Sequence, residues 1–360
     1  MEEQIVSWDI GTGYDLFASL VVLHKPANFG LRASWAAGVR SRVSSGNRET
    51  LERAQAVIHI PLEWLYSLDG EKNAQKVIRA LEKMPPEKRL QSLVHFHDQD
   101  ESMRVILQNI AGRGTWNDAD ENVLRKALQK FRRPVKQKTV RTILDIWASP
   151  AAFGEAYLEA LQDYYRVFFM EEERHIRKSL SQALENARQL SKTMPLGTLV
   201  ETLSHGVRYT EISRLARLVI IPSYWLSPLV VFEKISESMG MFLFGARPEH
   251  VSLVPGEVIP PNLLTVLKTL SDPTRLRILR YLKREKITPA ELSRRLRLRA
   301  PTVTHHLNAL RLAGLVSITL DEKHERHYQA RLDAIETTFD VLMQFLGEDV
   351  KDDGHDERDS

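Results

Sequence analysis

Cysteine is absent from all 360 residues of the chain. Disulfide bonds, cysteine-ligated zinc sites, thiolate metal sensors and cysteine nucleophiles are therefore excluded. Long hydrophobic segments are absent as well, because the longest uncharged stretch, 218–232, has 15 residues and contains Pro222 and Pro228. Such a stretch is too short and too interrupted to cross a bilayer as a helix. The acidic N-terminus does not have the profile of a signal peptide, so we expect a cytoplasmic protein with no membrane partner.

Composition indicates an ordinary globular protein of more than one domain. Hydrophobic residues make up 43% and charged residues 27% of the chain, close to the usual averages. A length of 360 residues allows two or three domains. We predict a mostly α fold with minor β (α+β), in which apolar residues at three- and four-residue spacing mark helices and short apolar runs mark strands. The predicted helices are 72–82, 121–131, 138–148 and 153–190, and the predicted strands are 4–10, 215–221 and 241–244.

Charge is distributed unevenly behind a net value of only +3. Residues 262–331 contain 15 Lys/Arg and 6 Asp/Glu, a net charge of +9, whereas residues 332–360 carry a net charge of −8. A compact basic block inside a near-neutral chain is typical of a module that binds a polyanion. The stretch 252–262, which contains three prolines, separates this block from a large N-terminal region.

Helix start and stop signals divide the basic block into short elements. Asp272 is placed as an N-cap before a proline, and Thr288-Pro289-Ala290-Glu291 forms a capping box at the start of a second helix. Pro301 begins a third helix, which ends at the C-cap glycine Gly314. Alternating apolar residues in 316–320 predict a strand, followed by a charged turn and a return strand. Helices followed by a two-stranded wing are the layout of a winged helix-turn-helix.

The third of these helices has one apolar face and one polar face. Val303, Leu307 and Leu310 share the apolar face on a helical wheel, and His306 at its rim is expected to be partly buried. Polar side chains near the N-terminal end point away from this face, where a helix-turn-helix contacts base edges in the major groove. Basic residues in the wing are expected to meet phosphate or the minor groove. The predicted base contacts are Thr302, Thr304, His305 and Asn308, and the predicted wing contacts are Lys323, His324 and Arg326.

Three segments together carry a family resemblance. Residues 271–279 (Ser-Asp-Pro-Thr-Arg-Leu-Arg-Ile-Leu), 301–307 (Pro-Thr-Val-Thr-His-His-Leu) and 313–316 (Ala-Gly-Leu-Val) resemble the ArsR-type winged-helix repressors of bacteria and archaea. The resemblance covers about a quarter of the chain, and its combined motifs are highly specific. It implies a homodimer that pairs through the helices flanking the module, 263–270 and 332–346. The residues expected at the dimer interface are Leu263, Leu267, Ile335, Phe339, Leu342 and Leu346.

The chain departs from the family pattern in three places. Metal-sensing members use a cysteine pair, or spaced Asp and His residues on the final helix, and this chain has no cysteine and no histidine in 332–346. Arg299 and Ala300 stand where a capping serine is common, so we expect a weak cap and a phosphate or guanine contact from Arg299. The wing lacks its usual glycine. The resemblance thus implies binding of double-stranded DNA, with neither a metal nor another cofactor.

The beginning of the chain carries a second resemblance. Residues 9–16 (Asp-Ile-Gly-Thr-Gly-Tyr-Asp-Leu) and 30–40 (Gly-Leu-Arg-Ala-Ser-Trp-Ala-Ala-Gly-Val-Arg) are similar to the N-terminal extension of certain long bacterial ArsR-like regulators. This implies a bacterial regulator architecture and assigns no activity to the extension. Gly11-Thr12-Gly13 is interpreted as a helix start after a strand, because the third glycine and the lysine of nucleotide-binding loops are missing.

Several charged clusters have a surface interpretation that we favour over a functional one. The stretch 122–144, with eight Lys/Arg and no acid, could extend the phosphate footprint or hold an anionic effector, although a solvated helix pair is favoured. Three groups contain residue types that bind metals, but each has a simpler explanation. In the order given below, these explanations are the two faces of a wing, a solvated loop and a charged helix surface. These groups are Asp321, His324 and His327; His95, His97, Asp98 and Asp100; and Glu172 with His175.

The sequence therefore predicts a homodimeric transcriptional regulator, and specifically a repressor, that binds an inverted-repeat operator. An unknown effector could act on the N-terminal region. No acid, base and nucleophile occur together at local spacing there, so no enzyme activity is expected. Two alternatives stay open: an enzyme with an appended winged helix, and a protein-interaction domain. The predicted domains are 1–255 (regulatory or partner-binding), 256–331 (winged helix-turn-helix), 332–346 (dimerisation helix) and 347–360 (acidic disordered tail).

Overall fold

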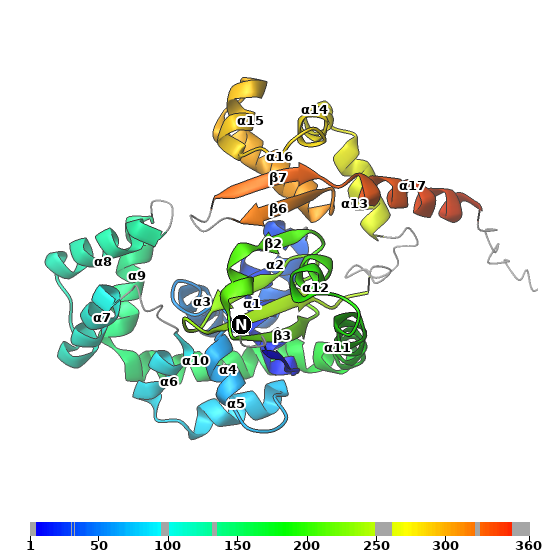
Figure 1. The fold of residues 1–360 in the computed structure, drawn as a ribbon. Coiled ribbons are helices and arrows are strands. Elements are labelled where there is room, and N and C mark those ends of the chain that lie inside the picture. Colours follow the sequence, from blue (N-terminus) through cyan, green and yellow to red (C-terminus); the bar gives the residue numbers. More distant parts are fainter. Residues whose placement is uncertain are drawn as a thin grey trace, which may run out of the picture. The chain divides into compact units, whose positions relative to one another are not determined.

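The computed structural model describes residues 5–29, 31, 33–94, 101–131, 135–248, 261–320 and 325–347. The chain forms two compact units. The N-terminal unit comprises Met1–Ser204 and Tyr209–Pro248, and the C-terminal unit comprises His205–Arg208 and Glu249–Ser360. Helices and strands occur in both, which confirms the predicted α+β class (Figure 1). Within the described ranges, no helix combines the length and the apolar character needed to cross a membrane.

A four-stranded sheet forms the centre of the N-terminal unit. Its order is β1 (Ile5–Trp8), β3 (Arg217–Ser223), β5 (Met239–Gly245) and β4 (Val231–Lys234). The strands β1, β3 and β5 run parallel, and β4 pairs antiparallel with β5. Near-continuous apolar runs such as β3 are typical of parallel strands covered on both faces, and the three predicted strands are confirmed. The strand β4 is not predicted from the sequence, because Val-Phe-Glu-Lys shows neither a long apolar run nor sustained alternation.

Helices make up most of the rest of the N-terminal unit (Figure 1). The four predicted helices are confirmed, and the longest consists of α10 and α11 joined by a π-helical turn at Tyr165–Phe169. The helix α1 begins at Thr12 directly after β1, as expected. The helices are α1 (Thr12–His24), α2 (Ala33–Arg42), α3 (Ser45–Ala54), α4 (Leu62–Ser67), α5 (Ala74–Lys83), α6 (Pro86–Leu93), α7 (Glu101–Arg113), α8 (Asp118–Phe131), α9 (Gln137–Ala148), α10 (Pro150–Tyr164), α11 (Met170–Ser191) and α12 (Leu196–Leu203).

The C-terminal unit has the order of helices and strands that the start and stop signals predict. The strands β6 and β7 are antiparallel with Ile318 opposite Tyr328, and a single bridge links Ile287 to Tyr328. Fully buried side chains such as Ile278, Leu292 and Leu307 form its core. The elements are α13 (Pro261–Leu270), α14 (Pro273–Leu282), α15 (Pro289–Leu296), α16 (Ala300–Leu312), β6 (Val316–Leu320), β7 (Arg326–Ala330) and α17 (Leu332–Gly347).

In the N-terminal unit, α10 packs against α6 at close range, and a glycine makes this approach possible. A Cβ atom placed on Gly154 would lie 2.2 Å from the carbonyl oxygen of Pro86. The buried guanidinium of Arg89 donates a hydrogen bond to the Gly154 carbonyl at 3.3 Å. The contact between the two helices therefore requires a residue without a side chain at this point.

Replacing Gly154 with alanine should lower the free energy of unfolding by about 1–3 kcal/mol, because the added methyl group cannot fit without backbone movement. Gly112→Ala in α7 is the matched control, since a Cβ there meets nothing within 4 Å. Alanine favours the helix there, so stability should stay equal or rise by up to about 1 kcal/mol. Urea unfolding followed by circular dichroism measures both variants. Equal stabilities would contradict the packing argument.

Candidate nucleic-acid interface

The helix α16 has a buried apolar face and an outward polar face. Val303, Leu307 and Leu310 have no exposed surface and belong to the core of the C-terminal unit. On the opposite face Thr302, His305 and Asn308 are exposed. Thr304 is half-buried, and its hydroxyl donates to the Ala300 carbonyl at 3.0 Å. The structure thus brings the four predicted base contacts to one side of one helix, while contact with bases stays a prediction.

The start of α16 follows a turn that the sequence does not reveal. Arg297, which ends α15, has a φ of 54°, in the left-handed region that favours glycine. The Leu298 amide donates to the Ser293 carbonyl at 3.1 Å, and the Ser293 hydroxyl donates to the Leu298 carbonyl. These bonds fix the connection between α15 and α16. Arg299, the N-cap of α16, makes no side-chain cap bond, which fits the expected weak cap.

Basic side chains surround this turn and differ in what they contact. Arg295 is paired with Glu285 and Glu291, so its charge is neutralised within the unit. Arg294, Arg297 and Arg299 are exposed and have no acidic partner in the described part of the chain. Unpaired exposed arginines beside the N-terminal end of α16 are available for phosphate oxygens.

The N-terminus of α14 lies next to α16, where Asp272 and His306 form a pair of titratable side chains. Asp272 is the N-cap of α14, and its Oδ1 accepts hydrogen bonds from the amides of Thr274 (2.8 Å) and Arg275 (3.0 Å). These bonds hold the pKa of Asp272 below its usual range. The His306 Nδ1 lies 4.0 Å from Asp272 Oδ1, and the histidine side chain is 12% exposed. Burial lowers the pKa of His306, although the Asp272 charge opposes this effect. His306 is thus partly buried, as expected.

The wing consists of β6 and β7, and only part of its predicted contact set can be placed. Arg326, the first residue of β7, is exposed. Lys323 and His324 lie outside the described residues, as does Asp321. The same is true of His95, His97, Asp98 and Asp100. Among the residues that are described, no three or more His, Asp or Glu side chains gather as a metal site.

A third strand extends the wing sheet, and it comes from an earlier part of the chain. The strand β2 (Val207–Tyr209) lies next to β6, so the sheet order is β2-β6-β7. The Ile318 amide donates to the Gly206 carbonyl at 3.0 Å, and the Arg331 guanidinium donates to the His205 carbonyl at 3.0 Å. Gly206 has a φ of 100°, and a Cβ there would lie 3.1 Å from Ser317 Cβ. Residues 205–208 thus belong to the C-terminal unit, although 40 residues of the N-terminal unit, 209–248, follow them.

The flanking helices expose an apolar stripe. Phe339 and Leu346 of α17 are 49% and 66% exposed, and Leu332 and Met343 are also exposed. Ile335 packs against the core of the unit, and Leu267 and Leu342 are half-buried. Leu263 is 3% exposed in the single chain. Its place in the dimer contact stays a prediction. Sequence periodicity alone does not decide which apolar residues of α13 and α17 face the core of the unit and which face solvent.

Comparisons with known proteins concern the C-terminal part of the chain. A family described as a helix-turn-helix domain matches residues 270–319. The transcriptional repressor SdpR of Bacillus subtilis (strain 168) is 27% identical over 89 residues, which cover 24% of this chain and 96% of that protein. The solved structure of an ArsR-like transcriptional regulator from Rhodococcus sp. RHA1 is 32% identical, covers 23% of this chain and 78% of its own, and has a TM-score of 0.22.

A homodimeric winged helix-turn-helix DNA-binding domain from Mycobacterium bovis, a possible ArsR-family regulator, is 22% identical over 26% of this chain and 85% of its own, with a TM-score of 0.20. Together, the order of elements, the motifs of α14 and α16 and the matches to SdpR and the helix-turn-helix family identify the C-terminal unit. It is an ArsR-type winged helix-turn-helix of transcriptional regulators.

His306 should make stability depend on pH. Because its pKa in the folded state is lowered, folding favours the neutral ring. The contribution of His306 to stability is therefore complete above the ordinary histidine pKa of about 6.5, and it is lost as the pH falls from there through the lowered pKa of the folded state. The loss of unfolding free energy between about pH 7.5 and 5.5 should be smaller in His306→Gln than in the parent protein. Asp272→Asn should enlarge the loss, since it removes the charge that favours protonation. Urea unfolding at both pH values measures this, and an identical loss in all three proteins would refute the assignment.

Gly206→Ala should weaken the pairing of β2 with β6, because a side chain at this φ is strained and meets Ser317 and Arg331. The amide of Ile318 should then exchange with deuterium at least about tenfold faster, which corresponds to about 1.4 kcal/mol. Gly197→Ala in α12 is the control, since a Cβ there meets nothing within 4 Å. Unchanged exchange at Ile318 would mean that the third strand is not held by this contact.

Proposed function

We propose that the protein is a homodimeric, sequence-specific transcriptional repressor whose DNA binding is controlled through its N-terminal unit. The observation that carries this proposal is the polar face of α16. Thr302, His305 and Asn308 are exposed on a helix whose opposite face has no accessible apolar side chain. Hydroxyl, imidazole and amide groups can donate to or accept from base edges in the major groove. The match to SdpR, which is named a transcriptional repressor, supports repression rather than activation.

Phosphate contacts would come from the arginines beside α16. Arg294, Arg297 and Arg299 flank its N-terminal end, and Arg326 lies at the wing. Such contacts position a protein on the duplex and carry no sequence information. Each neutralised phosphate releases counterions, so the affinity should fall steeply as salt rises.

A second copy of the chain is the partner that the exposed stripe of α17 fits. Leu332, Phe339, Met343 and Leu346 are spaced by seven, four and three residues, as in a helix pair with a continuous apolar seam. The resemblance of the sequence to dimeric ArsR-type repressors points the same way. Two-fold pairing would place the two α16 helices on half-sites about 34–36 Å apart, which is why an inverted repeat is the expected operator.

The buried carboxyl group of Asp15 does not support enzyme activity in the N-terminal unit. Burial raises the pKa of Asp15 to about 6, although hydrogen bonds from the Trp225 amide and the Ser223 hydroxyl favour its charged form. The carboxyl group of Asp15 has no exposed surface, and its Oδ1 accepts from the Ser223 hydroxyl at 2.8 Å and the Trp225 amide at 2.9 Å. A group enclosed in this way cannot reach a substrate without local opening, so we favour a regulatory unit.

The test is retention of sheared host DNA by the purified protein at about 0.15 M salt, followed by sequencing. The parent protein should enrich a few inverted-repeat sites, and a Thr304/His305 double-alanine variant should lose that enrichment while keeping unselective binding. A His175/Thr193 double-alanine variant is the matched control, since both residues are exposed in the N-terminal unit. Unselective retention, equal in all three proteins, would overturn the proposal and leave a polyanion surface.

Phe339→Asp should convert the dimer into a monomer, because it places a charge in the apolar seam. Light scattering coupled to size exclusion measures the mass, and operator affinity should fall at least about tenfold, since one subunit holds only one half-site. Thr337→Asp puts the same charge on an exposed neighbour outside the stripe and should leave the mass unchanged. A dimeric Phe339→Asp protein would show that the subunits pair elsewhere.

A further inference from the structure

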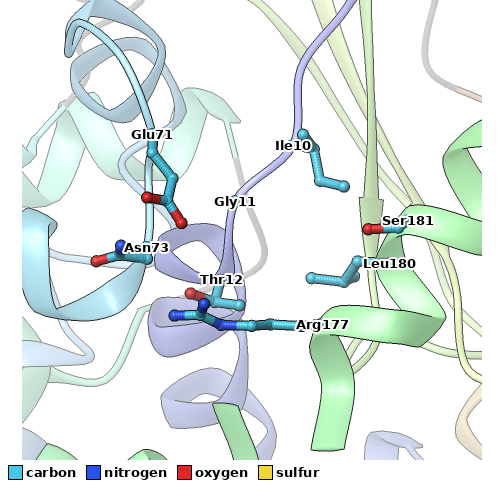
Figure 2. A pocket seen from close by; sticks show the side chains of 8 residues that line it. All are labelled: Ile10, Gly11, Thr12, Glu71, Asn73, Arg177, Leu180 and Ser181. Atoms are coloured by element: carbon cyan, nitrogen blue, oxygen red, sulfur yellow. The ribbon is translucent and has the colours of Figure 1, made fainter. Parts of the chain in front are cut away.

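A cavity opens in the N-terminal unit where β1 ends and α1 begins. It has a volume of about 210 Å³. This is below the roughly 300–1,000 Å³ of pockets for drug-sized ligands, so its occupant would be a small metabolite. Figure 2 shows the side chains around it, which come from three separate parts of the chain. They are Ile10, Gly11 and Thr12 after β1; Glu71 and Asn73 before α5; and Arg177, Leu180 and Ser181 of α11.

A buried carboxylate holds these three parts together. Glu173 is 4% exposed, and it accepts hydrogen bonds from the hydroxyls of Thr12 (2.5 Å) and Tyr165 (2.9 Å) and from the Ala74 amide (3.1 Å). One further contact, 3.4 Å long, comes from Arg177 Nη2. Because its lone pairs are used within the protein, Glu173 positions Thr12 and Arg177 and is not itself a ligand group.

Groups that could meet an anion lie on one side of the cavity. Arg177 uses Nη2 for Glu173, and its Nε and Nη1 have no partner among the described residues. The Thr12 amide, in the first turn of α1, has no helical acceptor either, because the first amides of a helix are left without one. The positive end of the α1 dipole adds to this field. The guanidinium of Arg177 ends beside Thr12 (Figure 2).

A negative charge and an apolar surface complete the lining. The Glu71 carboxylate turns toward Thr12 in Figure 2. Its Oε2 forms an ion pair with Lys76 Nζ at 3.0 Å, and this contact holds the pKa of the carboxyl below its usual range. Glu71 is therefore charged, and because a carboxylate offers about four lone-pair sites, it can accept a further ammonium group while it is paired with Lys76. Ile10 and Leu180 provide apolar contact area, and the Ser181 hydroxyl faces the cavity (Figure 2).

We propose that this cavity binds a free α-amino acid. Its carboxylate would meet Arg177 and the start of α1, its ammonium group would meet Glu71, and its side chain would lie on Ile10 and Leu180. A zwitterion can contact both Arg177 and Glu71, whereas an anion or an amine alone can contact only one of them. The role of this ligand as an effector rests on the regulation proposed above, but the binding itself does not.

Isothermal titration of the full-length protein with each proteinogenic amino acid tests the site without DNA. Its result therefore stands apart from that of the DNA-retention assay. At least one amino acid should bind, and Arg177→Gln and Glu71→Gln should each weaken binding at least about tenfold, as expected for the loss of a charge-assisted hydrogen bond. Arg174→Gln is the matched control, because it removes the same charge from the exposed surface of α11 outside the cavity.

Three outcomes would overturn the proposal. The first is no binding of any amino acid up to about 10 mM. The second is binding that neither variant weakens, which would place the ligand elsewhere. The third is binding of inorganic phosphate alone, weakened by Arg177→Gln and strengthened by Glu71→Gln, which would define an anion site. Binding of the amino acid but not of the matching carboxylate or amine alone would support the zwitterion.

Discussion

The burial of three side chains on one face of α16 is the constraint on which the DNA-binding surface depends. Val303, Leu307 and Leu310 have no exposed surface, and each contributes about 1.5–3 kcal/mol by leaving water. Together they fix the rotation of α16 about its axis. Once that rotation is set, Thr302, His305 and Asn308 must point outward, because they lie on the opposite side of the helix from the buried positions. The polar face is thus a consequence of core packing, and base recognition builds on a surface that the fold already holds rigid.

The C-terminal unit is predictable because its signals are local. Asp272, Thr288 and Gly314 each act within a few residues, and the structure gives them the capping roles that the sequence predicts. Contacts between residues far apart in the sequence have no such local signal. The pairing of β2 with β6 joins Gly206 to Ile318, and no pattern in three residues reveals it. The left-handed Arg297 is hidden for another reason, since arginine carries no signal for that conformation. Leu263 and Phe339 are equally apolar, and only tertiary packing decides that one is buried and the other exposed.

The N-terminal unit is less predictable for the same physical reason. The parallel strands β1 and β3 are separated by some two hundred residues of the chain. Their pairing therefore depends on contacts between residues far apart in the sequence. Periodicity finds the strands and the long helices, but it cannot show that β1, α5 and α11 meet around one cavity. The buried Glu173, which joins Thr12, Ala74 and Tyr165, appears in the sequence as one acid in a charged helix. Charge patterns therefore describe the surface of this unit and miss its interior.

The most direct test of the central claim is a change of specificity at α16. The parent protein and a His305→Arg variant would each select sites from a library of random duplexes. If α16 contacts base edges, the two selected motifs should differ at one symmetric position in each half-site and agree elsewhere, because arginine favours guanine. Identical motifs would contradict the account, since they would mean that this face of α16 does not contact the bases.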